Sequence, residues 1–71
     1  ALDGGLDGLS EIRKVIKKAS ELIKKNGKLI LEIGFDQKNK ILKILKEESF
    51  YINSTQKDLA NNDRCIVCTK L

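Results

Sequence analysis

The sequence predicts an α/β fold in the order helix, strand, helix, strand, strand. Three observations predict it. Near the start, apolar residues recur at steps of three and four, as on one face of an amphipathic helix. An almost unbroken apolar run, LILEI, follows, as in a strand that is covered on both faces. After a second helical stretch, FYINSTQ and RCIVC are rich in the aromatic and β-branched residues that strands favour.

The elements follow from these patterns in chain order. In the first helix the apolar stripe comprises Leu9, Ile12, Val15, Ile16, Ala19, Leu22 and Ile23. We expect one domain with a loop at residues 1–8, helices at 9–25 and 38–48, and strands at 28–33, 50–57 and 64–70.

The ends of the first helix carry recognisable signals. Asp7 or Ser10 can cap its N-terminus by accepting hydrogen bonds from free backbone N–H groups. At the other end, Lys24 and Lys25 suit the helix dipole, and Asn26-Gly27 predicts a left-handed turn that stops the helix.

The length, charge and composition of the chain restrict the classes of protein to which it can belong. A chain of 71 residues buries only roughly 60% of the surface that its unfolded form exposes, so we expect low stability without a staple or a partner. Its net charge of +4 admits a small basic module that binds RNA or protein without catalysis, and this stays the alternative function. However, 14 basic residues are interleaved with 10 acidic ones, and only Phe35, Phe50 and Tyr51 could stack on bases. A solvated lysine surface and no specific nucleic acid are therefore expected.

The sequence also disfavours secretion, membrane insertion and metal binding. No stretch resembles a signal peptide or a membrane span, so a cytoplasmic location is expected. With no histidine and only the Cys65-x-x-Cys68 pair, the chain cannot supply four zinc ligands, and no metal site is predicted. Residues three apart on a strand point to opposite faces, so these two cysteines should not form a disulfide with each other. Both are expected to act as small, buried hydrophobic residues.

The predicted layout leaves one face of the sheet uncovered. Both helices flank the first strand along the chain and should lie on the same side of the sheet. A strand with apolar residues on both faces would then expose an apolar surface. We therefore expect either low stability or self-association through this face.

Few residues in the chain suggest chemistry by themselves. The loop DGGLDG matches neither a calcium loop nor a phosphate loop, because the bidentate acid and the GK[ST] motif are both absent. Glu32 is a charge near the carboxyl end of an apolar strand, where ligands of α/β sheets collect, although the sequence alone slightly favours a solvated position at the rim of the sheet. Gln37 could cap the second helix, and Asp58 and Asp63 read as solvated turn residues.

Three blocks in order carry a family resemblance. ALDGGLDGL before a helix, then LILEIGFDQ, then KDLANNDRCIV resemble the C-terminal third of the HemK/PrmC methyltransferases. The resemblance implies an S-adenosylmethionine-dependent enzyme that methylates the glutamine of the GGQ motif in peptide chain release factors. It also implies the C-terminal part of a Rossmann-like fold, with a three-stranded mixed sheet whose last strand is central and antiparallel.

The resemblance places no catalytic or cofactor-binding residue in this chain. The family's glycine-rich cofactor loop and its Asn-Pro-Pro-Tyr motif precede the matching stretch, and the chain contains no proline. We therefore expect the fragment alone to be inactive. Positions at the active-site rim or in support of it are implied for eight residues: Gly4, Gly5, Asp7, Gly8, Glu32, Gly34, Gln37 and Arg64.

Overall fold

The structure is a computed structural model that describes residues 9–34 and 36–71. These contain two helices and three strands in the predicted order. The elements are α1 (Ser10–Leu22), β1 (Lys28–Glu32), α2 (Lys38–Glu47), β2 (Phe50–Lys57) and β3 (Asp63–Lys70). The expected loop at 1–8 lies outside the described residues.

The start of α1 differs from the expected cap. Leu9 occupies the N-cap position and makes no side-chain cap hydrogen bond. Ser10 is already the first helical residue, so the expectation that it caps the helix is wrong, and Asp7 lies outside the described residues. The buried Leu9 side chain fixes this end of the helix in the core instead.

Helix α1 also ends earlier than expected. Ile23 is extended, with φ −82° and ψ 130°, so Lys24 and Lys25 follow the helix and are not part of its last turn. The chain reverses at Asn26, whose φ of 73° lies in the left-handed region that asparagine tolerates. Gly27 N–H then donates to the Lys24 carbonyl at 2.8 Å and closes the turn.

The sheet has the strand order β1-β3-β2, with β3 antiparallel to both neighbours. The central, antiparallel position expected for the last strand is thus confirmed. The expectation of a mixed sheet is wrong for these strands. Although β1 and β2 run in the same direction, β3 separates them, so every paired neighbour is antiparallel.

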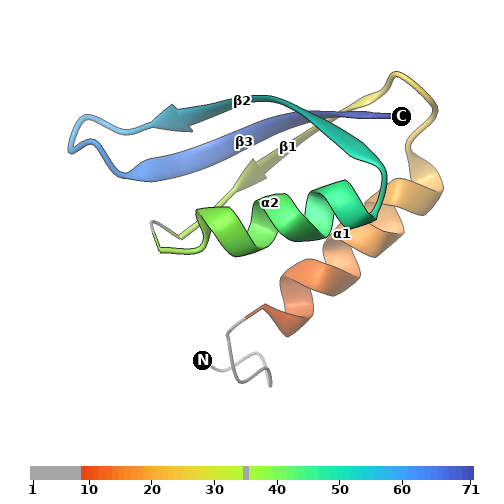
Figure 1. Ribbon diagram of the computed structural model, residues 1–71, viewed down its shortest axis with the longest axis horizontal. Helices are drawn as coiled ribbons and strands as arrows, with labels where there is room; N and C mark the ends of the chain where they lie inside the picture. Colours follow the sequence, from red (N-terminus) through yellow and green to blue (C-terminus); the bar gives the residue numbers. More distant parts are fainter. Residues whose placement is uncertain (1–8, 35) are drawn as a thin grey trace.

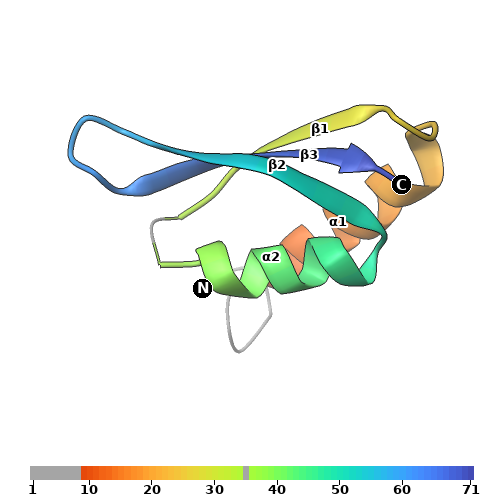
Figure 2. The same ribbon diagram turned by 45° about the horizontal axis from the view of Figure 1, so that its top comes forward.

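Both helices cover the same face of the sheet (Figures 1 and 2). The Cα atoms extend over 32 × 30 × 15 Å, and the short dimension fits two layers. Apolar side chains from all five elements fill the space between these layers. The buried residues are Leu9, Ile16, Leu31, Ile33, Ile41, Ile44, Leu45, Phe50, Ile66 and Cys68.

The opposite side of the sheet, called the outer face here, carries no helix among the described residues. It presents Ile30, Tyr51, Cys65 and Val67, because these alternate along their strands with buried residues. Ile30 is 65% exposed and Tyr51 58% exposed. The uncovered apolar face of the sheet is therefore as expected.

The two cysteines are both free. Cys68 is buried on the helix side, where its Sγ–H donates to the Leu29 carbonyl at 3.5 Å. Burial raises the pKa of the Cys68 thiol, which keeps it protonated at neutral pH. Cys65 is only partly buried, so the expectation that both are buried is half right.

Candidate functional site

Four of the eight candidate residues lie in the described parts of the chain, and the fold brings them to one end of the sheet. Glu32 and Gly34 lie at the carboxyl end of β1, Gln37 lies just before α2, and Arg64 lies near the start of β3 (Figure 1). Ile33 N–H donates to the Arg64 carbonyl at 2.9 Å and joins the two strand ends. The other four, Gly4, Gly5, Asp7 and Gly8, lie outside the described residues.

Gly34 and Gln37 close the turn between β1 and α2. Gln37 N–H donates to the Gly34 carbonyl at 3.0 Å, and Gly34 N–H donates to Gln37 Oε1 at 2.9 Å. A Cβ atom on residue 34 would lie 3.0 Å from Gln37 Oε1 and 3.2 Å from its Cδ. Glycine therefore leaves room for the glutamine side chain to fold back over the turn.

Gln37 does not cap α2 with its side chain. It occupies the N-cap position, but no side-chain cap hydrogen bond is made, because the carboxamide points back to Gly34. Its backbone carbonyl accepts the N–H of Ile41 at 3.0 Å. The expected capping role is wrong, and the side chain instead fixes the entry into the helix.

Arg64 is engaged with the turn between β2 and β3. Its Nε donates to Asp58 Oδ2 at 2.9 Å, while Asp58 Oδ1 accepts the N–H groups of Ala60 at 2.9 Å and Asn62 at 3.0 Å. The Asn62 N–H first, and then the Arg64 guanidinium, hold the pKa of the Asp58 carboxyl below its ordinary value of 3.8. Asp58 thus organises the turn, and the expectation that it is merely solvated is wrong.

Asp63 also differs from a solvated turn residue. It is the first residue of β3, and its Oδ1 lies 3.7 Å from Lys38 Nζ at the start of α2. That separation is too long for a hydrogen bond, and Oδ1 is a buried oxygen without a hydrogen-bond partner. The pair therefore joins α2 to β3 by charge alone.

Glu32 is exposed, and its side chain makes no ion pair or hydrogen bond with another of the residues 9–34 and 36–71. Its register partner on β3 is Cys65, so its side chain belongs to the outer face. Among Glu32, Gln37 and Arg64, it is the side chain without a partner in the described residues.

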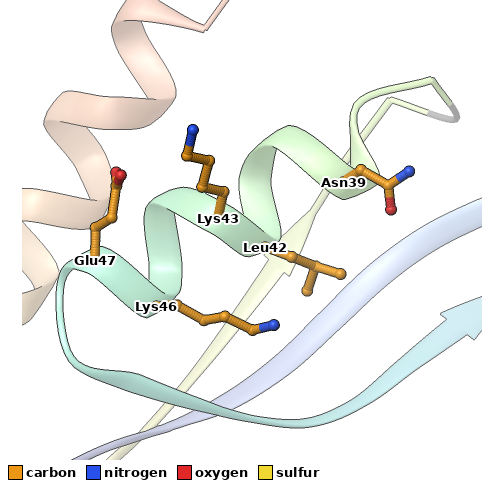
Figure 3. A pocket seen from close by; sticks show the side chains of 5 residues that line it. All are labelled: Asn39, Leu42, Lys43, Lys46 and Glu47. Carbon is orange, nitrogen blue, oxygen red and sulfur yellow. The ribbon is translucent and has the colours of Figure 1, made fainter.

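Two surface hollows lie elsewhere, along α2. Figure 3 shows one of about 530 Å³, lined by Asn39, Leu42, Lys43, Lys46 and Glu47. A second, of about 360 Å³, is lined by Arg13, Lys40, Lys43, Ile44 and Glu47 and lies where α1 and α2 approach each other. Neither of these two hollows is lined by Glu32, Gly34, Gln37 or Arg64.

No cofactor or metal site can be assembled from the part of the chain that the structure describes. Residues 9–34 and 36–71 contain no group of three or more histidine, cysteine, aspartate or glutamate side chains placed to hold a metal. At the end of the sheet where these candidate residues lie, the Gln37 side chain already accepts a hydrogen bond from Gly34 N–H. The Arg64 guanidinium already donates one to the Asp58 carboxylate. Glu32 alone could not hold a nucleoside, so the described residues do not fit S-adenosylmethionine.

Comparison with known proteins shows which proteins the chain is similar to. The chain is 41% identical to the release factor glutamine methyltransferase of Clostridium botulinum over 70 residues, which are 99% of this chain and 25% of that protein. It is 36% identical to the protein of the same name from Clostridium acetobutylicum over the same share of each chain. The relative of that name from Fusobacterium nucleatum is 41% identical over 90% of this chain and 18% of its own length.

The chain thus resembles the C-terminal part of proteins named release factor glutamine methyltransferase. It spans only about a quarter or less of the relatives it matches, and the match lies in their C-terminal part. A bifunctional methyltransferase of Rickettsia felis is also similar, at 38% identity over 86% of this chain and 12% of that protein. No protein-family model and no solved structure matches the chain. Among the described residues, neither helix has the length and apolarity needed to cross a bilayer.

Proposed function

We propose that the chain is the C-terminal portion of an S-adenosylmethionine-dependent methyltransferase. Its acceptor is the glutamine side chain of the GGQ motif in peptide chain release factors, and the intact enzyme works in the cytoplasm. The observation that carries the proposal is the match along 99% of the chain to relatives named release factor glutamine methyltransferase.

The arrangement of the sheet agrees with this proposal. Its three strands would form one edge of a larger Rossmann-like sheet, and the chain would continue from strands that precede it in the intact enzyme. Glu32, Gly34, Gln37 and Arg64 would then lie at the rim of the active site or support it, because the carboxyl ends of strands are where such sheets bind ligands. The Gly34–Gln37 turn and the Arg64–Asp58 pair would hold that rim in shape.

The 71-residue chain alone performs no methyl transfer in this proposal. In the intact enzyme the cofactor supplies the methyl group, and the residues of this chain supply only the edge of the sheet and part of the rim. Isothermal titration calorimetry of the 71-residue chain with S-adenosylmethionine is expected to give no binding heat. A stoichiometric isotherm would contradict the inactive-fragment proposal.

The rim assignment is tested in a protein that contains the upstream region. There we expect Glu32→Gln to reduce methyl transfer from labelled S-adenosylmethionine to a release factor roughly tenfold, since misplaced groups near a reacting centre are costly. Glu21→Gln removes another exposed carboxylate, on α1, and serves as the matched control. Equal activity of the two variants would remove Glu32 from the rim.

One observation favours the alternative of a basic binding module. Arg13, Lys40 and Lys43 line one hollow between the helices, and among the described residues that line it the one acid is Glu47. If this hollow binds RNA, a mobility shift will occur that weakens steeply with salt and with Lys40→Gln. Absence of a shift at low salt removes this alternative.

A further inference from the structure

The exposed side of α2 carries a row of lysines. Lys40, Lys43 and Lys46 are all exposed, and none of them forms an ion pair with another of the residues 9–34 and 36–71. Helix α2 holds four lysines and one glutamate, and α1 holds four basic and two acidic residues. The helix layer therefore carries an excess of positive charge that its own acidic residues do not balance.

Two hollows on this side of α2 share part of their lining. Lys43 and Glu47 line both the hollow of about 530 Å³ on α2 and the hollow of about 360 Å³ between α1 and α2. Figure 3 shows the Lys43 side chain on the side of α2 towards α1, and the Leu42 and Lys46 side chains on the other side. The two hollows thus adjoin, and ammonium groups flank an apolar side chain. This surface, formed by Lys40, Leu42, Lys43 and Lys46, is called the lysine face here.

The chemistry of the lysine face indicates that it stays exposed in the intact protein. Burying an ammonium group costs free energy unless an opposite charge compensates it. In the proposed function, the upstream part of the protein continues the sheet past β1, and the outer face offers it an apolar surface on which Ile30 is 65% exposed. The helices lie on the opposite side of the sheet from that surface (Figure 2). The upstream part therefore has an apolar surface to cover that is not the lysine face.

The lysine face begins close to the rim that the proposed function assigns. Gln37, which closes the turn with Gly34, is the N-cap residue of α2, and Lys40 follows in the first turn of the helix. From Lys40 to Lys46 the row extends about 9 Å along the helix axis, away from the rim. A protein that places a side chain at the rim would therefore lie next to the lysine face.

The lining of the two hollows favours an acidic protein segment over a nucleic acid. Single-stranded RNA is commonly held by stacking of its bases on aromatic side chains, and among the described residues that line the two hollows none is aromatic. Leu42 offers an apolar contact instead. Glu47 lines both hollows, where it would repel a phosphate backbone but can accept a hydrogen bond from a protein N–H group.

We propose that the lysine face docks an acidic segment of the protein that the intact enzyme methylates. Carboxylates of that segment bind the ammonium groups of Lys43 and Lys46, and an apolar side chain of the segment packs on Leu42. The inference rests on the proposed function, because it takes the release factor as the partner. Complementary charge of this kind mainly raises the rate of association and makes binding depend on salt.

Binding of a release factor to the protein that contains the upstream region tests the docking. At low salt, Lys43→Gln/Lys46→Gln should raise the dissociation constant roughly tenfold through slower association, and high salt should shrink this difference from the wild type. Lys24→Gln/Lys25→Gln is the matched control, because it removes the same charge from two exposed lysines before β1, at the other end of the sheet. It should bind like the wild type. Surface plasmon resonance at both salt concentrations gives the rate constants.

Several results would overturn the docking proposal. They are no binding by the wild type, unchanged binding by Lys43→Gln/Lys46→Gln, and equal weakening in both double variants. Thermal melts test whether the upstream region covers the lysine face, since a lower Tm in Lys43→Gln/Lys46→Gln than in the control would show an internal contact and overturn docking. Binding of an oligouridylate that depends on these lysines, without such dependence for the release factor, would assign the surface to RNA and also overturn it.

Methyl transfer separates this inference from the proposed function. In Lys43→Gln/Lys46→Gln the KM for the release factor should rise while kcat stays unchanged, because no group that touches the reacting atoms is altered. Lysine-dependent binding without any methyl transfer by the wild type would overturn the proposed function and support the docking surface. Methyl transfer with the same KM in all variants would support the proposed function and overturn the docking surface.

Discussion

At the scale of single residues, a few polar side chains determine the turns that connect the sheet to the helices. Gln37 folds back onto Gly34, and Asp58 binds two backbone N–H groups as well as the Arg64 guanidinium. Each side chain satisfies backbone donors that the strands and the helix leave unpaired. These side-chain hydrogen bonds add to the backbone hydrogen bonds that close both turns.

The charge of Asp58 should make the stability of the chain depend on pH. Because the pKa of Asp58 is below its ordinary value of 3.8 in the folded chain, the unfolded chain takes up the proton first as the pH falls. The stabilisation is present above about pH 4 and is lost as the pH falls through the folded pKa. Urea unfolding from about pH 7 to about pH 2.5 should show a smaller pH-dependent loss in Asp58→Asn than in the wild type. Identical profiles would assign the pH dependence to other groups.

At the scale of elements, the short connections fix where each helix and strand begins. The turn after α1 contains Asn26 in a left-handed conformation, and its N–H donates to the Lys70 carbonyl at 2.8 Å. One residue thus reverses the chain and also extends the pairing of β1 with β3. An early end of α1 at Leu22 is needed for this contact, because Ile23 must be extended to reach the turn.

A substitution at Asn26 should show the cost of that conformation. Asn26→Val should lower the free energy of unfolding by about 1–2 kcal/mol, because a β-branched residue is disfavoured at positive φ. Asn26→Gly is the control and should match or slightly exceed the wild-type stability. Thermal melts of the three proteins at one concentration measure the difference. A valine variant as stable as the glycine variant would show that φ at residue 26 is not a constraint.

At the scale of the whole molecule, two layers share a single core around β3. A chain of this size has a free energy of unfolding of about 4–11 kcal/mol by the usual value per residue. Ile66 and Cys68 of β3 are fully buried between the sheet and the helices, whereas Val67 between them faces outward. The central strand therefore contributes to the core on one face only.

Truncation of the central core should unfold much of the population. Ile66→Ala should cost about 2–5 kcal/mol, a large part of the total stability. Val67→Ala, one residue along and on the outer face, should cost less than about 1.5 kcal/mol. Denaturant unfolding followed by circular dichroism compares the two. Similar losses at both positions would mean that the outer face is covered in solution.

Hydrophobic periodicity predicts much of the fold, and where this prediction fails the cause is local. The stripe of α1 predicts a helix, yet Val15 and Leu22 are 49% and 72% exposed, because nothing in the described chain packs on that part of the helix. Hydrophobic periodicity also predicts three strands, but it does not predict their order in the sheet. The central position of β3 is predicted from the family resemblance. The apolar run of β1 suggests two covered faces, and only one is covered.

The candidate site was predictable in position but not in detail. The end of β1 and the start of α2 are adjacent in sequence, so Glu32, Gly34 and Gln37 had to lie together. The backward hydrogen bond from Gly34 to Gln37 depends on a side-chain rotamer, which no sequence period specifies. The Asp58–Arg64 pair could have been anticipated, since an aspartate before a turn commonly accepts backbone N–H groups two residues on.

The central position of the last strand has a consequence for biosynthesis. Neither β1 nor β2 has any other strand to pair with among the described residues, so both wait for β3. On the ribosome, residues 63–70 are made after everything they hold together. The helices can form while the chain is growing, but β1 and β2 can be joined only when β3 has left the exit tunnel. A nascent chain that stops before Asp63 would lack the strand that joins β1 to β2, which exposes both strands to aggregation.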